Sequence, residues 1–367
     1  MKKLITLIAV ALLLGGLCSA GASDVLAAQS EALDLDGLEG AAGDYMDGID
    51  LEQGITLDEG ISYILDTGSG QIFGIVRKAL RSGCLLLVVV MLCTLTGGLY
   101  DSAGGSGQTA DVVSLLGALA VTAVSVTDVH SLVGMGREAI ANMDTFSKVL
   151  IPAVTAAAAA SGAPGASVAR QFATMLFSDV LLTLINRLLL PLVYAYIAAS
   201  VGYTALGNEG LKRIGATLKW AVTTILTIVL LLFVSYLTVS GVIAGAADAA
   251  TIKAAKFTMS SVVPVVGGIL SDAAETVLAG AGILKNAVGV FGMIVILCMC
   301  VAPFLSLGIH YLTYKLTSAL TATLSSGRIG GLVDAIGGAF GLVLGMTGAC
   351  AVLLLVSLVS AVSAVTV

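Results

Sequence analysis

Long runs of apolar residues, separated by short polar segments, dominate the pattern of this chain. Each clear run approaches the roughly 20 residues that a helix needs to cross a bilayer. The runs are Leu80–Leu99, Val112–Val129, Met175–Tyr203, Trp220–Gly245, Ala287–Ile309 and Gly337–Ala361. They predict an all-α fold, a polytopic transmembrane bundle of about six to seven spans.

Two further stretches are apolar but interrupted. Phe146–Gly162 contains Pro152, and Phe257–Gly282 contains Pro264 together with two carboxylates. Backbone groups freed by a proline are tolerated at membrane depth only where protein or a water-filled cavity surrounds them. We therefore predict Pro/Gly-broken segments here. Either stretch could re-enter the membrane, and the first could span it.

Composition agrees with a membrane protein. The chain is 58% hydrophobic and 11% charged, and its mean hydropathy is +1.06. Soluble domains average about 45–50% apolar and about 25% charged residues. Lipid must therefore cover much of the surface. Zinc-protease, Walker and dinucleotide motifs are absent from the sequence, so we expect no catalytic residue, no cofactor, no metal and no nucleic-acid partner.

The N-terminus has the pattern of a processing signal. Lys2 and Lys3 precede the apolar run Leu4–Leu17, which is too short to span, and small residues follow. Residues 1–22 are predicted to be a cleaved signal peptide, with an uncleaved first helix as the alternative. Residues 23–76 contain acidic residues but no Lys or Arg, which predicts an acidic extracytoplasmic leader. Residues 77–367 would form the polytopic membrane domain.

The distribution of basic residues favours six spans over seven. With six, the loop Gly207–Lys219 and the loop that carries Lys315 and Arg328 both lie inside, as the positive-inside rule requires. Counting Phe146–Gly162 as a seventh span moves the first of these loops outside. One basic cluster lies on the outer side of the first span and fits only an interfacial helix over Ile61–Leu80: Arg77, Lys78 and Arg81.

Arg187 is the most unusual single residue, because it lies in the middle of an apolar run. Ionisable side chains at that depth normally face a bundle interior or a wet cavity and are candidates for function. A structural ion pair with Asp179 or Asp128 is the alternative.

Glycines at a spacing of four occur on two runs. This spacing places them on one helix face and lets a neighbouring backbone approach closely. The helix-packing candidates are Gly241, Gly245, Gly337, Gly341 and Gly345. Packing within the chain and packing between copies both remain open.

The second interrupted stretch carries a family resemblance. Its most specific pieces are Ala255-Lys256-Phe257, Val263-Pro264-Val265, Asp272-Ala273, Glu275-Thr276-Val277 and Leu284-Lys285-Asn286-Ala287-Val288-Gly289. Supporting pieces are Ser240-Gly241-Val242 and Leu190-Pro191-Leu192. On these residues the chain resembles the stage III sporulation protein AE family. Arg187 departs from the apolar residue expected of that family.

The resemblance implies a role rather than a reaction. It implies a permease-like component of the channel or secretion apparatus in the mother-cell membrane that faces the forespore. Ring-forming subunits, an ATPase and a membrane insertase would be the partners, together with the lipid bilayer. The chain itself would not be an enzyme.

Candidate lining or docking residues follow from the polar pattern of the same stretch, and Arg187 joins them. They are Arg187, Lys256, Pro264, Asp272, Glu275 and Lys285. Two other hypotheses remain: a self-sufficient secondary transporter of a small solute, and a membrane scaffold for the sporulation complex.

Overall fold

The computed structural model describes residues 40, 42, 57–102, 107–160, 164–262, 267–324 and 328–363. Apart from Gly207 and Asn208, every one of these residues is helical. The elements in chain order are α4 (Leu57–Ser102), α5 (Gly107–Ala160), α6 (Pro164–Leu184), the π-helical turn η3 (Ile185–Leu189), α7 (Leu190–Leu206), α8 (Glu209–Val262), α9 (Gly267–Leu324) and α10 (Arg328–Ser363). The predicted all-α class is confirmed. The signal peptide and most of the leader lie outside the described residues.

Six helical stretches are long and apolar enough to cross a membrane. They are Gly70–Leu99, Val112–Ala157, Ala173–Leu206, Glu209–Tyr236, Ala287–Thr323 and Arg328–Val359. Each contains the larger part of one predicted run. The protein is thus a multi-pass membrane protein, and the count of six agrees with the topology that the basic loops favour.

One predicted break is wrong. Pro152 lies inside α5, which continues without interruption to Ala160, so Phe146–Gly162 is neither re-entrant nor a separate span over its described part. Proline is tolerated inside membrane helices where neighbouring groups satisfy the freed backbone. Ala153 and Val154, the next two residues, are buried against the bundle.

The second interrupted stretch forms the far ends of two long helices. α8 extends to Val262 and α9 begins at Gly267, while Pro264 lies outside the described residues. No re-entrant segment is present in the described parts of 257–282, which continue α8 and α9. The expected interfacial helix over Ile61–Leu80 is also part of a longer element, α4, which crosses the predicted boundary between leader and membrane domain.

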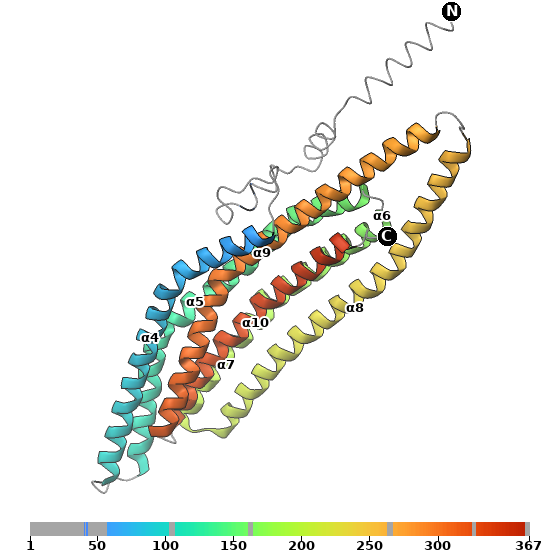
Figure 1. Ribbon diagram of the computed structural model, residues 1–367. Helices are drawn as coiled ribbons and strands as arrows, with labels where there is room; N and C mark the ends of the chain where they lie inside the picture. Colours follow the sequence, from blue (N-terminus) through green and yellow to red (C-terminus); the bar gives the residue numbers. More distant parts are fainter. Residues whose placement is uncertain are drawn as a thin grey trace, which may run out of the picture.

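α10 is the central helix of the bundle. It packs against α9, α5, α7, α8 and α6, and Figure 1 shows it between α9 on one side and α8 on the other. Its fully buried residues include Phe340, Val343 and Met346. Tyr314 of α9 meets Phe340 edge-on, with ring centroids 5.1 Å apart, a geometry that aromatic pairs prefer.

The end of α7 is fixed by a single glycine. Gly207 has φ 68°, a left-handed conformation that costs glycine little because it has no Cβ. Its N–H donates to the carbonyl of Tyr203 at 2.8 Å, which closes the helix in the manner of an αL cap. The chain then reverses into α8.

Inter-helix contacts fix the depth of α4 and α5 relative to α10. Ile329, at the start of α10, contacts Gly117 of α5. A Cβ built at Gly117 would also lie 3.1 Å from Sγ of Cys93 in α4. The hydroxyl of Thr204, near the end of α7, donates to the carbonyl of Arg328 at 3.3 Å. One end of α7, α8 and α10 is therefore level with Cys93 and Gly117.

α4 and α5 continue beyond that level. α4 extends nine residues past Cys93 to Ser102, which is about 14 Å of helix. Figure 1 shows α4 and α5 projecting together below the ends of the other helices. We call residues 82–102 of α4 with residues 107–127 of α5 the α4–α5 hairpin, and the rest of the described helices the bundle.

Candidate functional site: buried polar groups of the bundle core

The predicted lining and docking residues lie mostly at the junction of α8 and α9. Lys256 is about two turns before the end of α8, and Asp272 and Glu275 lie in the first turns of α9. Lys285 lies about five turns after the start of α9. The surroundings of these four side chains are outside the described part of the structure, as is Pro264. Their proposed roles therefore stay predictions.

Arg187 lies in η3 with its side chain exposed. The described part of the chain surrounds it with no wet cavity. Asp179 is exposed as well, and the described ion pairs do not include Arg187. Asp128 instead accepts a hydrogen bond from Tyr314. Among the described residues, Arg187 therefore makes no ion pair with Asp179 or Asp128, and its proposed lining role stays a prediction.

The glycines of α10 pack within the chain. A Cβ built at Gly337 would lie 2.9 Å from Cβ of Tyr314, and one at Gly341 would lie 3.1 Å from the ring of Tyr311. Both neighbours belong to α9. Gly345 has only an ordinary contact, at 3.8 Å from Leu226. Gly337 and Gly341 thus let α9 approach α10 closely, while the surroundings of Gly241 and Gly245 lie outside the described residues.

The structure shows a buried polar cluster between α5 and α9 that sequence analysis did not select. The hydroxyl of Tyr314 donates to Oδ2 of Asp128 at 2.9 Å, and both residues are buried. Ser125, one turn before Asp128, is also buried, and its Oγ has no hydrogen-bond partner among the described residues. A carboxylate away from water is costly unless it is hydrogen-bonded, so this bond links the two helices tightly.

His310 extends the cluster by one turn of α9. Its Nδ1 is 2.7 Å from the carbonyl oxygen of Ser306. Nδ1 must carry the proton to donate this bond, which leaves Nε2 of the neutral ring as an acceptor. That Nε2 is buried and lacks a partner among the described residues. The ring of Phe340 lies edge-on nearby.

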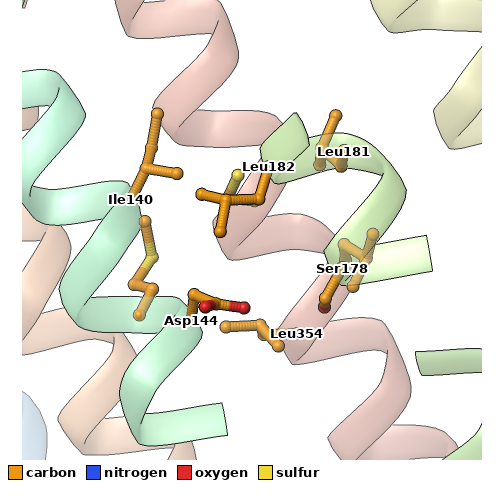
Figure 2. A pocket seen from close by; sticks show the side chains of 9 residues that line it. Ile140, Asp144, Ser178, Leu181, Leu182 and Leu354 are labelled. Atoms are coloured by element: carbon orange, nitrogen blue, oxygen red, sulfur yellow. The ribbon is translucent and has the colours of Figure 1, made fainter. Parts of the chain in front are cut away.

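A second polar group lies in a cavity between α5, α6 and α10. The cavity volume is about 20 Å³, enough for one water molecule, which needs about 10–15 Å³. Apolar side chains form most of its wall, and Asp144 and Ser178 supply polar atoms. Figure 2 shows Asp144 between Ile140 and Leu354, with Ser178 on the opposite helix.

The two oxygens of Asp144 have different surroundings. Oδ2 accepts a hydrogen bond from Nζ of Lys148 at 2.7 Å, and the Lys148 side chain is 58% exposed. Oδ1 is buried and has no hydrogen-bond partner in the part of the chain that the structure describes. An unsatisfied carboxylate oxygen beside a water-sized cavity can accept a hydrogen bond from a water molecule.

The arrangement provides buried hydrogen-bond acceptors at the helix interfaces. Asp128, His310 and Asp144 are separate acceptors along the interfaces of α5 with α9 and with α10. Among the residues that the structure describes, no group of three His, Cys, Asp or Glu side chains is placed to hold a metal ion. Sequence signals for these groups were weak. The clearest signal was the spacing of four between Asp144 and Lys148 in a largely apolar stretch.

Fold and site together define a class: a multi-pass helical membrane protein with buried ionisable groups at its central helix interfaces. Residues 49–365 match the family model of stage III sporulation protein AE. The chain therefore belongs to the stage III sporulation protein AE family, as its resemblance predicted.

A curated relative agrees. The chain is 24% identical over 263 residues to stage III sporulation protein AE of Bacillus subtilis (strain 168). The match covers 71% of this chain and 66% of the relative, which is slightly less than two thirds of the relative's own length. No solved structure matches the chain.

Proposed function

We propose that this protein is the permease-like membrane component of the apparatus that connects mother cell and forespore during endospore formation. The observation that carries the proposal is the family match over residues 49–365, since membership implies a role in sporulation. The six long apolar helices agree with the part of a membrane-embedded subunit. Ring-forming subunits, an ATPase and a membrane insertase are the proposed partners.

The buried acceptors give the proposal a structural basis. Ionisable groups inside a helical membrane protein are costly and are retained mainly along pathways for ions, protons or substrates. Asp128 and Asp144 both belong to α5, and they face different neighbours, α9 and the cavity beside α6. α5 therefore carries acceptors on both of its main interfaces.

The test is capture of the tagged protein from sporulating cells that lack their own copy. We expect other sporulation membrane proteins to be recovered and spore formation to be restored. Asp144→Asn should lower the spore yield without lowering recovery of partners. Asp334→Asn is the matched control, because Asp334 is half-exposed and pairs with Lys315 at the surface. Recovery of no sporulation membrane protein would overturn the proposal.

A self-sufficient transporter is the second candidate, and the unpaired Oδ1 of Asp144 and Nε2 of His310 favour it. Purified protein in sealed vesicles would then move protons or a small solute alone, and Asp144→Asn would abolish that movement. An apparatus component predicts no flux without its partners.

A further inference from the structure

α8, α9 and α10 define the depth of the hydrocarbon core on one side of the molecule. Three of their segments contain no Asp, Glu, Lys or Arg: residues 220–236, 287–314 and 335–359. The segments begin at one level, because Lys219 approaches Gly338 and Lys315 pairs with Asp334. Helices of about 17–25 residues cross a hydrocarbon core, so the three charge-free segments are long enough to cross it side by side.

α5 carries charge at the same depth. Gly136 of α5 packs against Val343 of α10. Further along, a Cβ built at Gly292 of α9 would contact both Leu150 of α5 and Leu358 of α10. Between these two levels α5 exposes three charged side chains: Arg137, Glu138 and Lys148. All three lie level with the charge-free segment of α10.

The α6–η3 segment is polar at this depth as well. Phe177 of α6 meets Tyr236 of α8, with ring centroids 6.2 Å apart, and Tyr196 of α7 approaches Gly338 of α10. Between these levels three polar side chains are exposed at a spacing of four: Asp179, Thr183 and Arg187. That spacing places them on one side of the segment.

The two sets of side chains form one surface, which we call the α5–α6 polar face. Its members are Arg137, Glu138, Lys148, Asp179, Thr183 and Arg187. Lys148 lies within electrostatic range of Asp179, and α5 packs directly against α6. The cavity beside Asp144 adjoins this face, since Lys148 binds Oδ2 of Asp144 and Ser178, next to Asp179, lines the cavity.

Neither lipid nor a dry protein contact suits the α5–α6 polar face. Charged groups exposed to acyl chains are strongly disfavoured. The buried centres of protein interfaces are depleted in charged residues, and charges buried without partners are costly. Among the described ion pairs, only that of Lys148 with Asp144 includes a residue of this face. Water is the surrounding that satisfies the other charged groups at this depth.

We propose that the α5–α6 polar face lines a water-filled passage at membrane depth. Other chains of the apparatus form the remaining walls, while α8, α9 and α10 face lipid with their charge-free segments. The cavity beside Asp144 then lies one side chain away from the passage. This inference rests on the proposed function and adds to it the surface that meets water and dissolved polar solutes.

The test measures labelling of added cysteines by a membrane-impermeant methanethiosulfonate, with the full chain in opened membranes of sporulating cells. Ala141→Cys, between Glu138 and Lys148, and Thr183→Cys report on the α5–α6 polar face. Thr227→Cys in α8 is the matched control, because it is equally exposed in class and its neighbour Leu226 contacts Gly345 at the same depth. Labelling of the parent protein gives the contribution of its native cysteines.

We expect the two cysteines on the polar face to react at least about tenfold faster than the α8 cysteine, because the reactive thiolate forms in water and is suppressed in apolar surroundings. Equal rates at all three positions would overturn the proposal. Absence of labelling on the polar face would also overturn it. Disulfide cross-linking between copies of Ala141→Cys, without labelling, would assign the face to a dry contact between copies and reject the passage.

A second measurement tests the charge of the passage. In the Thr183→Cys background, Arg187→Gln should lower the ratio of rates for an anionic and a cationic methanethiosulfonate about threefold, the effect of one unit charge about one helical turn away in water. Arg187→Lys keeps the charge and should leave the ratio unchanged. A ratio that does not respond to Arg187→Gln would show that the reagent does not pass this residue, against a shared passage.

Capture of partners from the same membranes separates this inference from the proposed function. Recovery of other sporulation membrane proteins with an unlabelled polar face would reject the passage alone. A labelled polar face without recovery of those partners would reject the apparatus and leave water access to the face in place.

Discussion

The α9–α10 pair and the α4–α5 hairpin are similarly apolar but bury their side chains to very different extents. The most apolar windows of α9 and α10 are each 56% buried, whereas those of α4 and α5 are 17% and 28% buried. The mean hydropathies differ much less, at 2.6 and 2.5 against 2.2 and 2.0. Hydropathy thus reports that a helix avoids water, but not whether its neighbours are lipid or protein.

The two regions also differ in the kinds of contacts that their side chains make. The α9–α10 interface combines close glycine contacts, an aromatic pair and a hydrogen-bonded carboxylate. The hairpin, over residues 82–100 and 112–127, has no charged residue at all. The α9–α10 interface is thus held by packing and polar pairing, whereas the hairpin exposes many of its apolar side chains. Substitutions should therefore act on stability in the first region far more than in the second.

The sharpest contrast is expected between Phe340→Ala and Leu92→Ala. Phe340 is fully buried, and removing a buried phenyl group costs about 3–5 kcal/mol. Leu92 is mostly exposed, so its truncation should leave the thermal unfolding midpoint in detergent almost unchanged. Comparable shifts for the two variants would show that the hairpin is packed as tightly as the bundle.

Adding volume should be nearly as harmful where α9 and α10 approach. Gly337→Leu forces a side chain against Tyr314, and overpacking costs about 1–3 kcal/mol or more. Gly308→Leu in α9 is the matched control, because nothing lies within 4 Å of a Cβ built there. The yield of monodisperse protein on size exclusion should fall for Gly337→Leu only. Equal yields for the two variants would show that the close contact at Gly337 is not needed for packing α9 against α10.

The Tyr314–Asp128 bond gives a subtler test. Tyr314→Phe leaves a buried carboxylate without this partner, which costs about 1–3 kcal/mol. Tyr311→Phe, one turn earlier and half-buried, should have little effect on the free energy of unfolding. Combining Tyr314→Phe with Asp128→Leu should recover part of the loss, since two apolar partners need no hydrogen bond. Further loss in the double variant would argue against the pairing.

The smallest effect is expected at the surface pair Lys315–Asp334. Its atoms are 2.6 Å apart, but the side chains are 31% and 46% exposed. Exposed ion pairs contribute about 0–1 kcal/mol, so Asp334→Asn should change unfolding only slightly. A shift as large as that of Tyr314→Phe would mean that a partner or lipid desolvates this ion pair.

Much of the fold was accessible from sequence, because a long apolar run between polar segments allows little other than a helix in a membrane. The positions of the runs relative to one another along the bundle axis could not be predicted from the sequence. The runs Leu80–Leu99 and Val112–Val129 look like the other four, and only contacts such as Gly83 with Thr313 show that they lie at a different level. Depth depends on the register between helices, which no single run encodes.

The site was less accessible for a related reason. Asp144 and Asp128 became notable only through what surrounds them, a cavity beside α6 and a tyrosine 186 residues later in the chain. Arg187 shows the reverse case: its position in an apolar run suggested burial, but its side chain is exposed. Burial of one residue is a property of all the helices around it, so composition near the residue predicts it poorly.

The π-helical turn at Ile185–Leu189 has a consequence for how the α6–α7 segment can vary. A π-helical turn contains one residue more than the α-helix would need, and one residue corresponds to about 100° of rotation about the axis. Deleting a single residue there would turn α7 by that angle relative to α6, swinging Tyr196 away from Gly338 while α6 kept its contact with Ser357. The extra residue in the turn therefore sets the rotation of α7 about the helix axis relative to α6. Insertions or deletions within the π-helical turn should therefore be tolerated less well than at the α7–α8 reversal. There the helix is interrupted, so a change in length does not rotate one helix relative to the other.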